Sequence, residues 1–387
     1  MARLDEIFDL QMGKTPSRSN ADYWTDGQYD WVSIADLGTY KKYVEDTKEK
    51  ISASAVQESG IKSVPANTVI MSFKLSLGKT AITQEPVYTN EAIMAFIPTG
   101  KYTVLPDYFY YLLSAKDWTK GTNRAVMGAT LNKATLGAVS VTVPPLNEQR
   151  KIVMILDKVS DLLAKHHQQL DKLDELVKSR FIEMFGEPEN NNKAWPVKSL
   201  DKLCTVGSSK RVYQSEQSSE GVPFWRISDL VSKIDTGTVD SALFISEIKY
   251  TELKRAGLVP VTGDILVTSR GTLGRCYIIQ DEDCFYFQDG MISWLSNYSE
   301  EITPLYLQYL FTMSGFRKQI DNTQAGSTVA YLSIAMLKKL QVMVPDKALQ
   351  EQFAAFVAQT DKSKLAIQKS LDKLEILKKA LMQKYFG

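Results

Sequence analysis

Two stretches of the chain repeat apolar residues at the three-four spacing of an amphipathic helix. They cover residues 146–187 and 346–387, and each follows a proline and has a glycine at or near its end. A helix of about 35 residues is about 50 Å long and needs a partner to bury its stripe. We therefore expect the two helices to pair as an antiparallel coiled coil. His166, Thr360 and Lys364 interrupt the stripes, and we expect them to set the register of the pair or to face a third helix, rather than to bind a ligand or take part in catalysis.

The remaining residues mix short β-like runs with helix-like runs. The β-like runs lie at residues 68–73, 139–143, 264–268 and 340–344, and the helix-like runs at residues 107–118 and 305–316. This mixture predicts two compact α+β domains, at residues 1–145 and 188–345. We expect the tyrosines of the run at 107–118 to lie in the core rather than to stack on a ligand.

The two halves of the chain resemble each other. Residues 31–37 read WVSIADL and residues 224–230 read FWRISDL, the LNEQ of residues 146–149 matches the LQEQ of residues 349–352, and LDKL occurs at residues 170–173 and 371–374. These matches keep their order at a spacing of about 200 residues, which indicates a tandem duplication. The predicted fold class is α+β, with two duplicated globular domains separated by long paired helices and related by a pseudo-two-fold axis.

Composition narrows the class of protein. Of 387 residues, 44% are hydrophobic and 24% are charged, which is the balance of a soluble globular chain. Cys204, Cys276 and Cys284 form no CxxC pair, so we expect free thiols and a cytoplasmic location. No apolar run approaches the roughly 20 residues that cross a bilayer, and the first residues lack the pattern of a signal peptide. No membrane partner is expected.

Two similar domains on a rigid spacer suit duplex DNA with two separated half-sites. Because the domains have diverged, we expect the half-sites to differ in sequence. The charge is unusual for such a protein: 46 Lys and Arg against 45 Asp and Glu give a net charge of +1, whereas chains that contact many phosphates are usually basic. Either the chain binds another kind of partner, or other subunits supply part of the phosphate contact.

Three features together resemble the specificity subunit of type I restriction–modification systems. They are the duplicated plan, the proline followed by Glu-Gln at the start of each long helix, and the sequence SRGTLGR at residues 269–275. The resemblance covers essentially the whole chain. It implies that residues 1–145 and 188–345 are target-recognition domains for double-stranded DNA. It also implies that the helices at 146–187 and 346–387 set the half-site spacing and dock two methyltransferase (modification) subunits.

The same resemblance implies a subunit without catalytic activity. S-adenosylmethionine, ATP and Mg would be bound by the methyltransferase and restriction/translocase subunits, and this chain would bind no cofactor. In this interpretation the partners clamp the DNA, so the reading subunit need not be strongly basic.

Turns after β-like runs, and polar loops early in each domain at residues 13–18 and 207–211, supply the candidate DNA-binding residues. The alternative is that these segments are ordinary solvated surface turns and loops. The turn at 268–275 combines two arginines with hydroxyls and glycines, and a guanidinium fork suits base edges and phosphates. The turn at 72–79 carries lysines instead, which favours phosphate contacts. Segments 124–130 and 323–328 could place backbone N–H groups on a phosphate. The candidates are Lys14, Thr15, Arg18, Ser72, Lys74, Ser76, Lys79 and Arg124 in the first domain, and Lys210, Arg211, Arg226, Ser269, Arg270, Thr272 and Arg275 in the second.

No catalytic or metal-binding motif is evident. The only adjacent prolines, Pro144 and Pro145, lack the Asn or Asp and the aromatic residue of an amino-methyltransferase, and no Gly-x-Gly occurs. His166 and His167 project about 100° apart on a helix and cannot chelate one metal ion together. Two alternatives remain: a stand-alone DNA-modifying or DNA-cleaving enzyme with duplicated halves, and an adaptor that binds protein.

Overall fold

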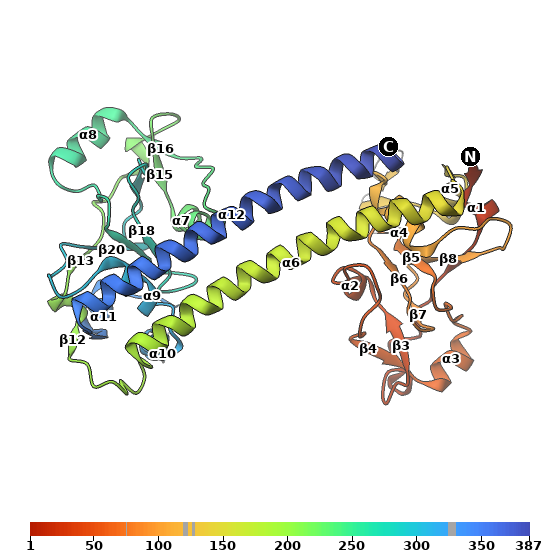
Figure 1. Cartoon of the computed structure of the whole chain (residues 1–387), viewed down its shortest axis with the longest axis horizontal. Coiled ribbons are helices and arrows are strands. Elements are labelled where there is room, and N and C mark those ends of the chain that lie inside the picture. Colours follow the sequence, from red (N-terminus) through yellow and green to blue (C-terminus); the bar gives the residue numbers. More distant parts are fainter. Residues whose placement is uncertain (75, 119–122, 126–127, 324–329) are drawn as a thin grey trace. The chain divides into compact units, whose positions relative to one another are not determined.

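Both stretches with apolar residues at helical spacing form single helices in the computed structural model of the chain (Figure 1). Helix α6 spans Leu146–Phe185 and helix α12 spans Lys347–Phe386, with 40 residues each. The structure describes residues 1–74, 76–118, 123–125, 128–323 and 330–387, and for residues 123–125 and 128–130 it describes the backbone only. Within these ranges, no helix combines the length and the hydropathy needed to span a membrane.

The chain divides into two units, and each long helix contributes to both. Unit 1 comprises residues 1–167 and 369–387, and unit 2 comprises residues 168–368. Each unit therefore contains one globular region, one part of α6 and one part of α12.

In unit 1 the two long helices run antiparallel. His166 of α6 and Ser370 of α12 share a hydrogen bond of 3.0 Å between Nε2 and Oγ. Leu381 and Phe386, further along α12, pack against the core that contains Ile152, which lies earlier on α6. Residue numbers therefore rise along α6 as they fall along α12. The hydrogen bond of His166 fixes the register of the two helices, one of the roles expected for a polar residue within the apolar stripe.

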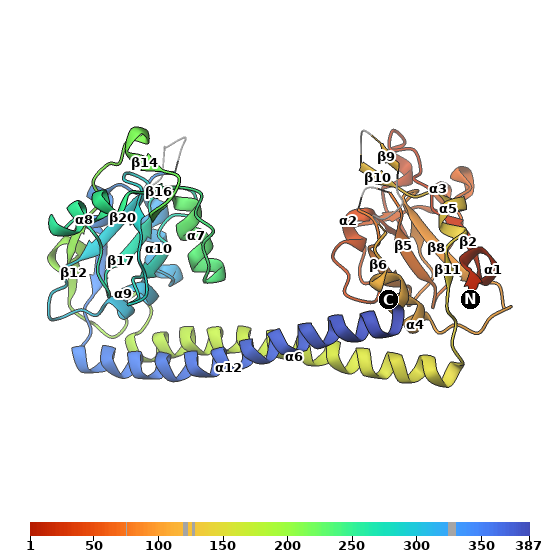
Figure 2. The ribbon, with the colours of Figure 1, turned by 90° about the horizontal axis from the view of Figure 1, so that it is seen from above.

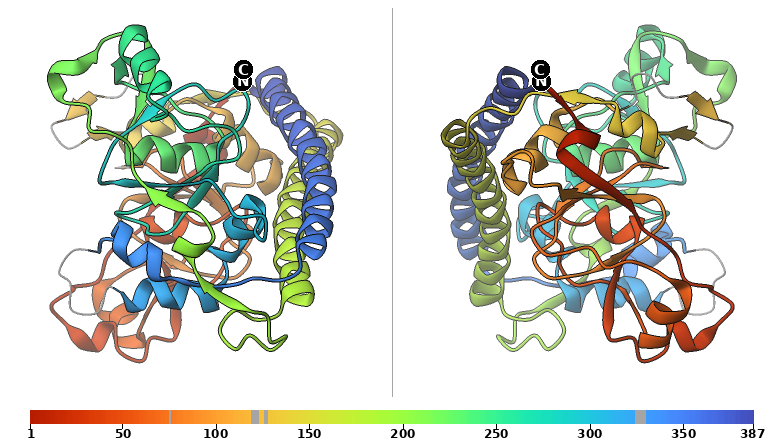
Figure 3. Two further views of the ribbon diagram at one scale, coloured as in Figure 1. Left: turned by 90° about the vertical axis from the view of Figure 1, so that its left-hand side faces the viewer. Right: turned by 90° about the vertical axis from the view of Figure 1, so that its right-hand side faces the viewer.

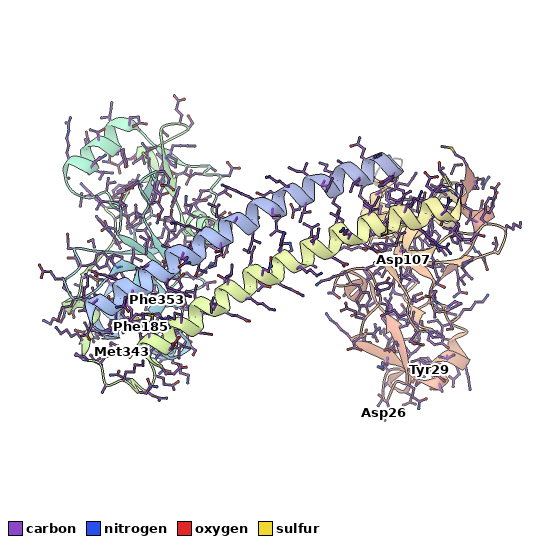
Figure 4. All side chains as sticks on the ribbon, viewed as in Figure 1. Asp26, Tyr29, Asp107, Phe185, Met343 and Phe353 are labelled. Carbon is purple, nitrogen blue, oxygen red and sulfur yellow. The ribbon has the colours of Figure 1, made fainter. Side chains whose placement is uncertain are left out.

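Unit 2 repeats the antiparallel pairing with aromatic residues. Phe181 and Phe185 of α6 each lie 5.5 Å from Phe353 of α12, measured between ring centroids. Figure 4 shows Phe185 and Phe353 close together. Lys364 donates a hydrogen bond of 2.6 Å to the carboxylate of Asp174. All three phenylalanines are fully buried, so apolar burial, at about 25 cal/mol per Å², stabilises this part of the pair.

Each unit contains a four-stranded antiparallel sheet with the same strand order. The order is β2-β8-β5-β6 in unit 1 and β13-β20-β17-β18 in unit 2. Apolar and β-branched runs form these strands because they suit a buried pleated surface. The strands are β2 (Phe8–Met12), β5 (Val69–Ser72), β6 (Thr80–Ile82), β8 (Ile93–Pro98), β13 (Thr205–Gly207), β17 (Ile265–Thr268), β18 (Cys276–Ile278) and β20 (Ile292–Ser296).

A second, smaller sheet accompanies the main sheet in each unit. Its order is β4-β3-β7 in unit 1 and β14-β16-β15-β19 in unit 2, with parallel pairing of β3 to β7 and of β15 to β19. The strands are β3 (Tyr29–Val32), β4 (Glu49–Ile51), β7 (Tyr88–Thr89), β14 (Gln217–Ser218), β15 (Val222–Trp225), β16 (Phe244–Ile245) and β19 (Tyr286–Phe287). The two units therefore share their topology, which confirms the duplication.

A short strand pair closes each globular region. Strand β1 (Ala2–Arg3) pairs with β11 (Ser140–Val141), and β12 (Val197–Ser199) pairs with β21 (Gln341–Met343). In each case the first strand of the region meets the last strand before a long helix. We call this pair the terminal clasp.

Short helices cover the sheets, and one of them differs from its prediction. Tyr108 and Tyr111 are buried, as expected for the core. The prediction of one helix over residues 305–316 is wrong, because the chain breaks where Met313 adopts an extended backbone with a ψ of 134°. Phe311 and Met313 are both buried, so the apolar pattern continues across the break and does not reveal it. The helices are α1 (Leu4–Ile7), α2 (Ile34–Leu37), α3 (Ala53–Ser59), α4 (Pro106–Ala115), α5 (Lys133–Gly137), α7 (Ile227–Thr236), α8 (Glu247–Arg255), α9 (Pro304–Leu310), α10 (Ser314–Asn322) and α11 (Ile334–Lys339).

A buried glutamine fastens the start of α6 to the first globular region. Gln149 has no solvent-exposed surface. Its Oε1 accepts the N–H of Leu105 at 2.8 Å, and its Nε2 donates to the carbonyls of Thr103 and Pro144 at 2.9 Å each. The side chain thus satisfies three backbone groups that the loop before α4 and the start of α6 would otherwise leave unpaired.

Gln350 does the same for α12. Its Oε1 accepts the N–H of Thr303 at 2.8 Å, and its Nε2 donates to the carbonyls of Glu301 and Pro345, each at 2.8 Å. The residue-by-residue match of LNEQ with LQEQ is therefore wrong by two positions. Gln350 occupies the buried place, whereas Gln352 is exposed.

A half-buried lysine joins the first globular region to α6. Lys42 Nζ lies 2.7 Å from a carboxylate oxygen of Asp107 and 2.5 Å from one of Asp157, and Figure 4 shows Asp107 beside α6. Tyr111 donates a hydrogen bond of 2.6 Å to Asp157. Burial disfavours the charged form of Asp107, but hydrogen bonds from Lys42 and Tyr43 outweigh it and lower the pKa of Asp107. The ion pair is thereby favoured at neutral pH.

Candidate nucleic-acid interface

The strand register brings two predicted loops of unit 1 to one edge of its main sheet. Met12 at the end of β2 pairs with Met94, and Ser72 at the end of β5 pairs with Ile93. Both strands therefore end where β8 begins, and the loops that follow them leave the sheet as neighbours. These loops are residues 13–18 and 73–79. We call this edge of the main sheet, in either unit, the loop edge.

Unit 2 places its predicted loops in the same way. Gly207 at the end of β13 pairs with Trp294, and Thr268 at the end of β17 pairs with Ile292 near the start of β20. The corresponding loops are residues 208–211 and 269–275. The topology thus groups the loop candidates of each unit at one edge, although about 60 residues separate the two loops in the sequence.

The loop after the third strand of each main sheet has one backbone conformation in both units. The N–H of Gly78 donates to the carbonyl of Ser72 at 2.9 Å, and the N–H of Gly274 donates to the carbonyl of Thr268 at 2.9 Å. The φ angles of these glycines are +82° and +70°, values that favour glycine. The repeated Leu-Gly-Lys/Arg motif therefore reflects a turn that the two units share.

Two predicted contact residues use their hydroxyls inside the fold. Ser72 and Ser269 are buried. The hydroxyl of Ser72 donates to the carbonyl of Ser76, and the hydroxyls of Ser269 and Ser293 share a hydrogen bond of 2.7 Å. These two serines support the loops, and the exposed side chains of Ser76 and Thr272 remain available for a ligand.

Arg270 is exposed and lies over an aromatic ring. Its guanidinium carbon is 4.9 Å from the ring centroid of Tyr331, and the two residues form an antiparallel backbone bridge. A guanidinium that stacks through its face keeps the N–H groups in its plane available for acceptors. The sequence analysis missed Tyr331, because only the backbone bridge reveals that it lies beside the loop.

Arg275 is held by a carboxylate. Its Nη1 donates a hydrogen bond of 3.0 Å to Asp235 of α7, and this contact lowers the pKa of the Asp235 carboxyl. At the equivalent place in unit 1, Lys79 is exposed. The two loop edges therefore present different cations in different settings.

Arg18 of unit 1 is also paired. Its guanidinium carbon lies 3.7 Å from the ring centroid of Trp24, and its Nη2 donates to Glu49 at 2.9 Å. The hydrogen bond from Arg18 lowers the pKa of Glu49. In the free protein the two terminal nitrogens of this arginine are thus directed at Glu49, which engages part of its charge and of its donor capacity.

The other candidates of unit 1 lie on the same two loops. Lys14 is exposed and donates a hydrogen bond of 2.5 Å to the carbonyl of Ser59. Thr15 donates to the carboxylate of Glu91. Lys74 is half-buried at the start of the neighbouring loop. Lysine chains are long and flexible, so these positions suit contact with phosphates more than with bases.

In unit 2, three further candidates lie on two chain segments. Lys210 is exposed, and the Nε of its neighbour Arg211 donates a hydrogen bond of 2.9 Å to Asp289. Arg226 is exposed at the N-terminus of α7, where its N–H donates to Asp229 at 2.7 Å. Arg226 follows β15, and the parallel strand β19 leads to Asp289. Arg211 and Arg226 therefore lie at the same end of this region.

Some predicted positions lie outside the described residues. Arg124 belongs to β9 (Asn123–Ala125), of which the backbone alone is described, so the place of its side chain is not given. In Figure 2 the hairpin of β9 and β10 (Gly128–Thr130) lies on the side of unit 1 away from the long helices. Residues 126–127 and 324–328 of the predicted phosphate-binding segments also fall outside the described residues.

Candidate ligands for a metal ion are dispersed. In the described ranges, no three His, Cys, Asp or Glu side chains are grouped so that they could hold a metal ion. Cys204, Cys276 and Cys284 are free thiols. Burial raises the pKa of Cys204 to about 12, so this thiol stays protonated at neutral pH.

Comparisons with other proteins agree along the whole chain. The sequence profile of a family described as type I restriction modification DNA specificity domain matches residues 1–175 and 192–377. The chain is 25% identical over 411 residues to the type I restriction enzyme MjaIX specificity subunit of Methanocaldococcus jannaschii, a match that covers 99% of this chain and 91% of the relative.

Two solved structures share the fold. The S subunit of a type I restriction–modification system from M. genitalium superimposes with a TM-score of 0.56 at 16% identity, and the match covers 100% of this chain and 95% of that one. A protein solved in work on complex assembly and conformational transition of the type I R-M system gives a TM-score of 0.62 at 15% identity, over 100% of this chain and 96% of that one.

Proposed function

Because the chain belongs to the type I restriction modification DNA specificity family, we propose that it is the DNA-recognition subunit of a type I restriction–modification complex. The observation that carries the proposal is the duplicated loop edge, where each unit groups exposed cationic and hydroxyl side chains on neighbouring loops. Contact with base edges and phosphates requires side chains of this kind, held in place by a rigid sheet.

The two recognition regions are proposed to read different half-sites. Residues 1–145 would read one half and residues 188–345 the other. Equivalent positions of the two regions carry different side chains: Lys79 in the first region corresponds to Arg275 in the second, and Ser33 corresponds to Arg226. An arginine fork and a lysine ammonium select different acceptors, so the proposed site is asymmetric.

The near-neutral charge fits a reader whose partners help to hold the DNA. Arg18, Arg211 and Arg275 each pair with a carboxylate on their own unit. Part of the positive charge at the loop edges is thus neutralised before DNA binds. Phosphate contacts from partner subunits would supply the remaining non-specific affinity.

The long helices are proposed to dock two methyltransferase subunits. The LDKL matches make Leu176 of α6 equivalent to Leu377 of α12, and these leucines are 49% and 45% exposed. Exposed apolar side chains at repeated positions favour two equivalent docking surfaces. Restriction/translocase subunits would join through the methyltransferases or the helices.

The subunit is proposed to be non-catalytic and cytoplasmic. S-adenosylmethionine would be bound by the methyltransferase subunits, and ATP and Mg by the restriction/translocase subunits, with no cofactor on this chain. The purified chain alone is then expected neither to methylate nor to cleave DNA. Activity of the purified chain without partners would favour the alternative, an enzyme with duplicated halves.

The test is to map methylated adenines in a host that carries this subunit with its methyltransferase partner. We expect one split motif with two unlike halves and a fixed spacer, because two diverged regions read the duplex. The control is the same host without this chain, in which the motif should be unmethylated. A continuous motif, or methylation that persists without the chain, would contradict the proposal.

A further inference from the structure

A cavity of about 450 Å³ lies beside the 269–275 loop of unit 2. Four segments line it: helix α7 with Ile234, the loop with Thr272 and Arg275, helix α9 with Gln308, and the following segment with Thr312 and Arg317. Its polar side chains are two guanidiniums, the hydroxyls of two threonines and of Tyr309, one thiol and one amide. This set is rich in hydrogen-bond donors and suits an anion.

Arg317 is the cation that remains unneutralised in this cavity. Its Nη2 donates to the carbonyl of Leu273 at 3.0 Å, which fixes the guanidinium against the base of the loop. The neighbouring Lys318 pairs with Glu189 and Arg275 pairs with Asp235. Among the described residues no carboxylate forms an ion pair with Arg317, so its other donors and its charge are available to a ligand.

The cavity belongs to the loop edge. Strand β18 is the outermost strand of its sheet and begins at Cys276, directly after the loop. Gln308 Nε2 of α9 donates to the carbonyl of Cys276 at 3.3 Å. Helix α9, which carries Gln308, therefore lies beside Cys276, the first residue after the loop. The cavity is thus at the same sheet edge as Arg270.

Unit 1 fills the equivalent place with an aromatic ring. Cδ1 of Trp118 lies 2.7 Å from the position that a β-carbon on Gly78 would take. At the equivalent Gly274 an aliphatic side chain takes this place, with Cδ1 of Ile320 at 2.6 Å, and Nη1 of Arg317 lies 4.0 Å from the same position. The guanidinium beside this turn is thus a feature of the second recognition region and not a necessity of the shared fold.

We propose that this cavity binds one phosphate of the DNA backbone beside the half-site that unit 2 reads, with Arg317 as the contact. The inference rests on the proposed function. A planar guanidinium anchored through one nitrogen can present its remaining N–H groups to phosphate oxygens. Thr272 and Thr312 offer hydroxyls on either side.

The test compares Arg317→Gln with Lys318→Gln in the complex of full chain and methyltransferase subunits. Binding to a duplex with the mapped motif is measured over a series of salt concentrations. Each phosphate contact contributes about 0.9 to the slope of log K against log salt. We expect Arg317→Gln to lower the slope by about 0.9. The matched Lys318→Gln removes the same charge from an ion-paired site and should leave the slope unchanged.

Two further measurements separate a phosphate contact from a structural role. Arg317→Lys keeps the charge and should retain the wild-type slope, whereas loss of loop structure would change both variants alike. The loss of affinity in Arg317→Gln should be equal on the mapped motif and on unrelated duplex, because a phosphate contact carries no sequence information. A loss confined to the motif would identify a base contact instead and overturn the inference.

If the wild-type complex binds the motif in a salt-dependent way and Arg317→Gln leaves the slope unchanged, this inference alone is overturned. A wild-type complex that does not distinguish the motif from unrelated duplex contradicts the proposed function. The two failures are therefore distinguishable.

Discussion

Arginines at the loop edges fall into two groups. Arg18, Arg211 and Arg275 donate to carboxylates of their own unit, so part of the charge and of the donor capacity of each is already engaged before DNA binds. Arg270 instead lies over the ring of Tyr331, an arrangement that restricts the guanidinium and leaves its donors free. Among the predicted residues, we therefore expect Arg270 to be the one that reads a base.

We expect Arg270→Ala to weaken methylation of the mapped motif by about 10–100-fold, which corresponds to about 1–3 kcal/mol for one lost bidentate contact. The loss should relax the sequence preference at one position of one half-site. The measurement is methylation of a randomised half-site library, with Arg255→Ala as a control because Arg255 is exposed on α8. Full methylation with unaltered preference in Arg270→Ala would remove this residue from the interface.

The sequence could indicate these arginines but not their partners. The turn at 268–275 is a local pattern of glycines, hydroxyls and cations, and such patterns are readable directly. Tyr331, Asp235 and Arg317 approach the turn only through strand pairing and helix packing. The burial of Ser72 and Ser269 likewise depends on neighbouring strands, so it was not apparent from the turn itself.

Among the elements, the long helices were the most predictable, because the apolar stripe persists for many turns. The sequence alone did not explain why a Glu-Gln motif lies at the start of each helix. Gln149 and Gln350 each satisfy three backbone groups. An alignment of the two short motifs cannot identify which of two nearby glutamines is buried, and it paired Gln149 with Gln352.

We expect Gln350→Ala to destabilise the full chain substantially, at about 1–3 kcal/mol for each buried backbone group left without a partner. Gln352→Ala provides the matched control, since the same deletion at an exposed site two residues away should change stability by no more than about 0.5 kcal/mol. Urea unfolding of the two variants is the measurement. Equal stability of both would show that the buried hydrogen bonds do not fasten the helix.

At the scale of the whole molecule, the duplication was readable from the order of short matches, and the common sheet orders agree with it. The sheets themselves were not predictable. Their strands are short, two to six residues each, and many pair with strands distant in the sequence. Short apolar runs specify a strand but not its neighbour.

We expect exchange of residues 1–145 for the corresponding region of another specificity subunit to change one half of the methylated motif and to preserve the other. Each unit carries its own loop edge, so the regions should act independently. Methylated adenines mapped in a host with the hybrid give the result. A simultaneous change of both halves, or of neither, would contradict the assignment of one half-site to each region.

The terminal clasp bears on how such proteins diversify. Because β1 meets β11 and β12 meets β21, the two ends of each recognition region emerge together beside a helix start that a buried glutamine secures. The gene segment between those ends can then be replaced by recombination, as a cassette, while the junctions stay chemically the same. Variation would accumulate inside the cassette, and new specificities would arise without any adjustment of the long helices.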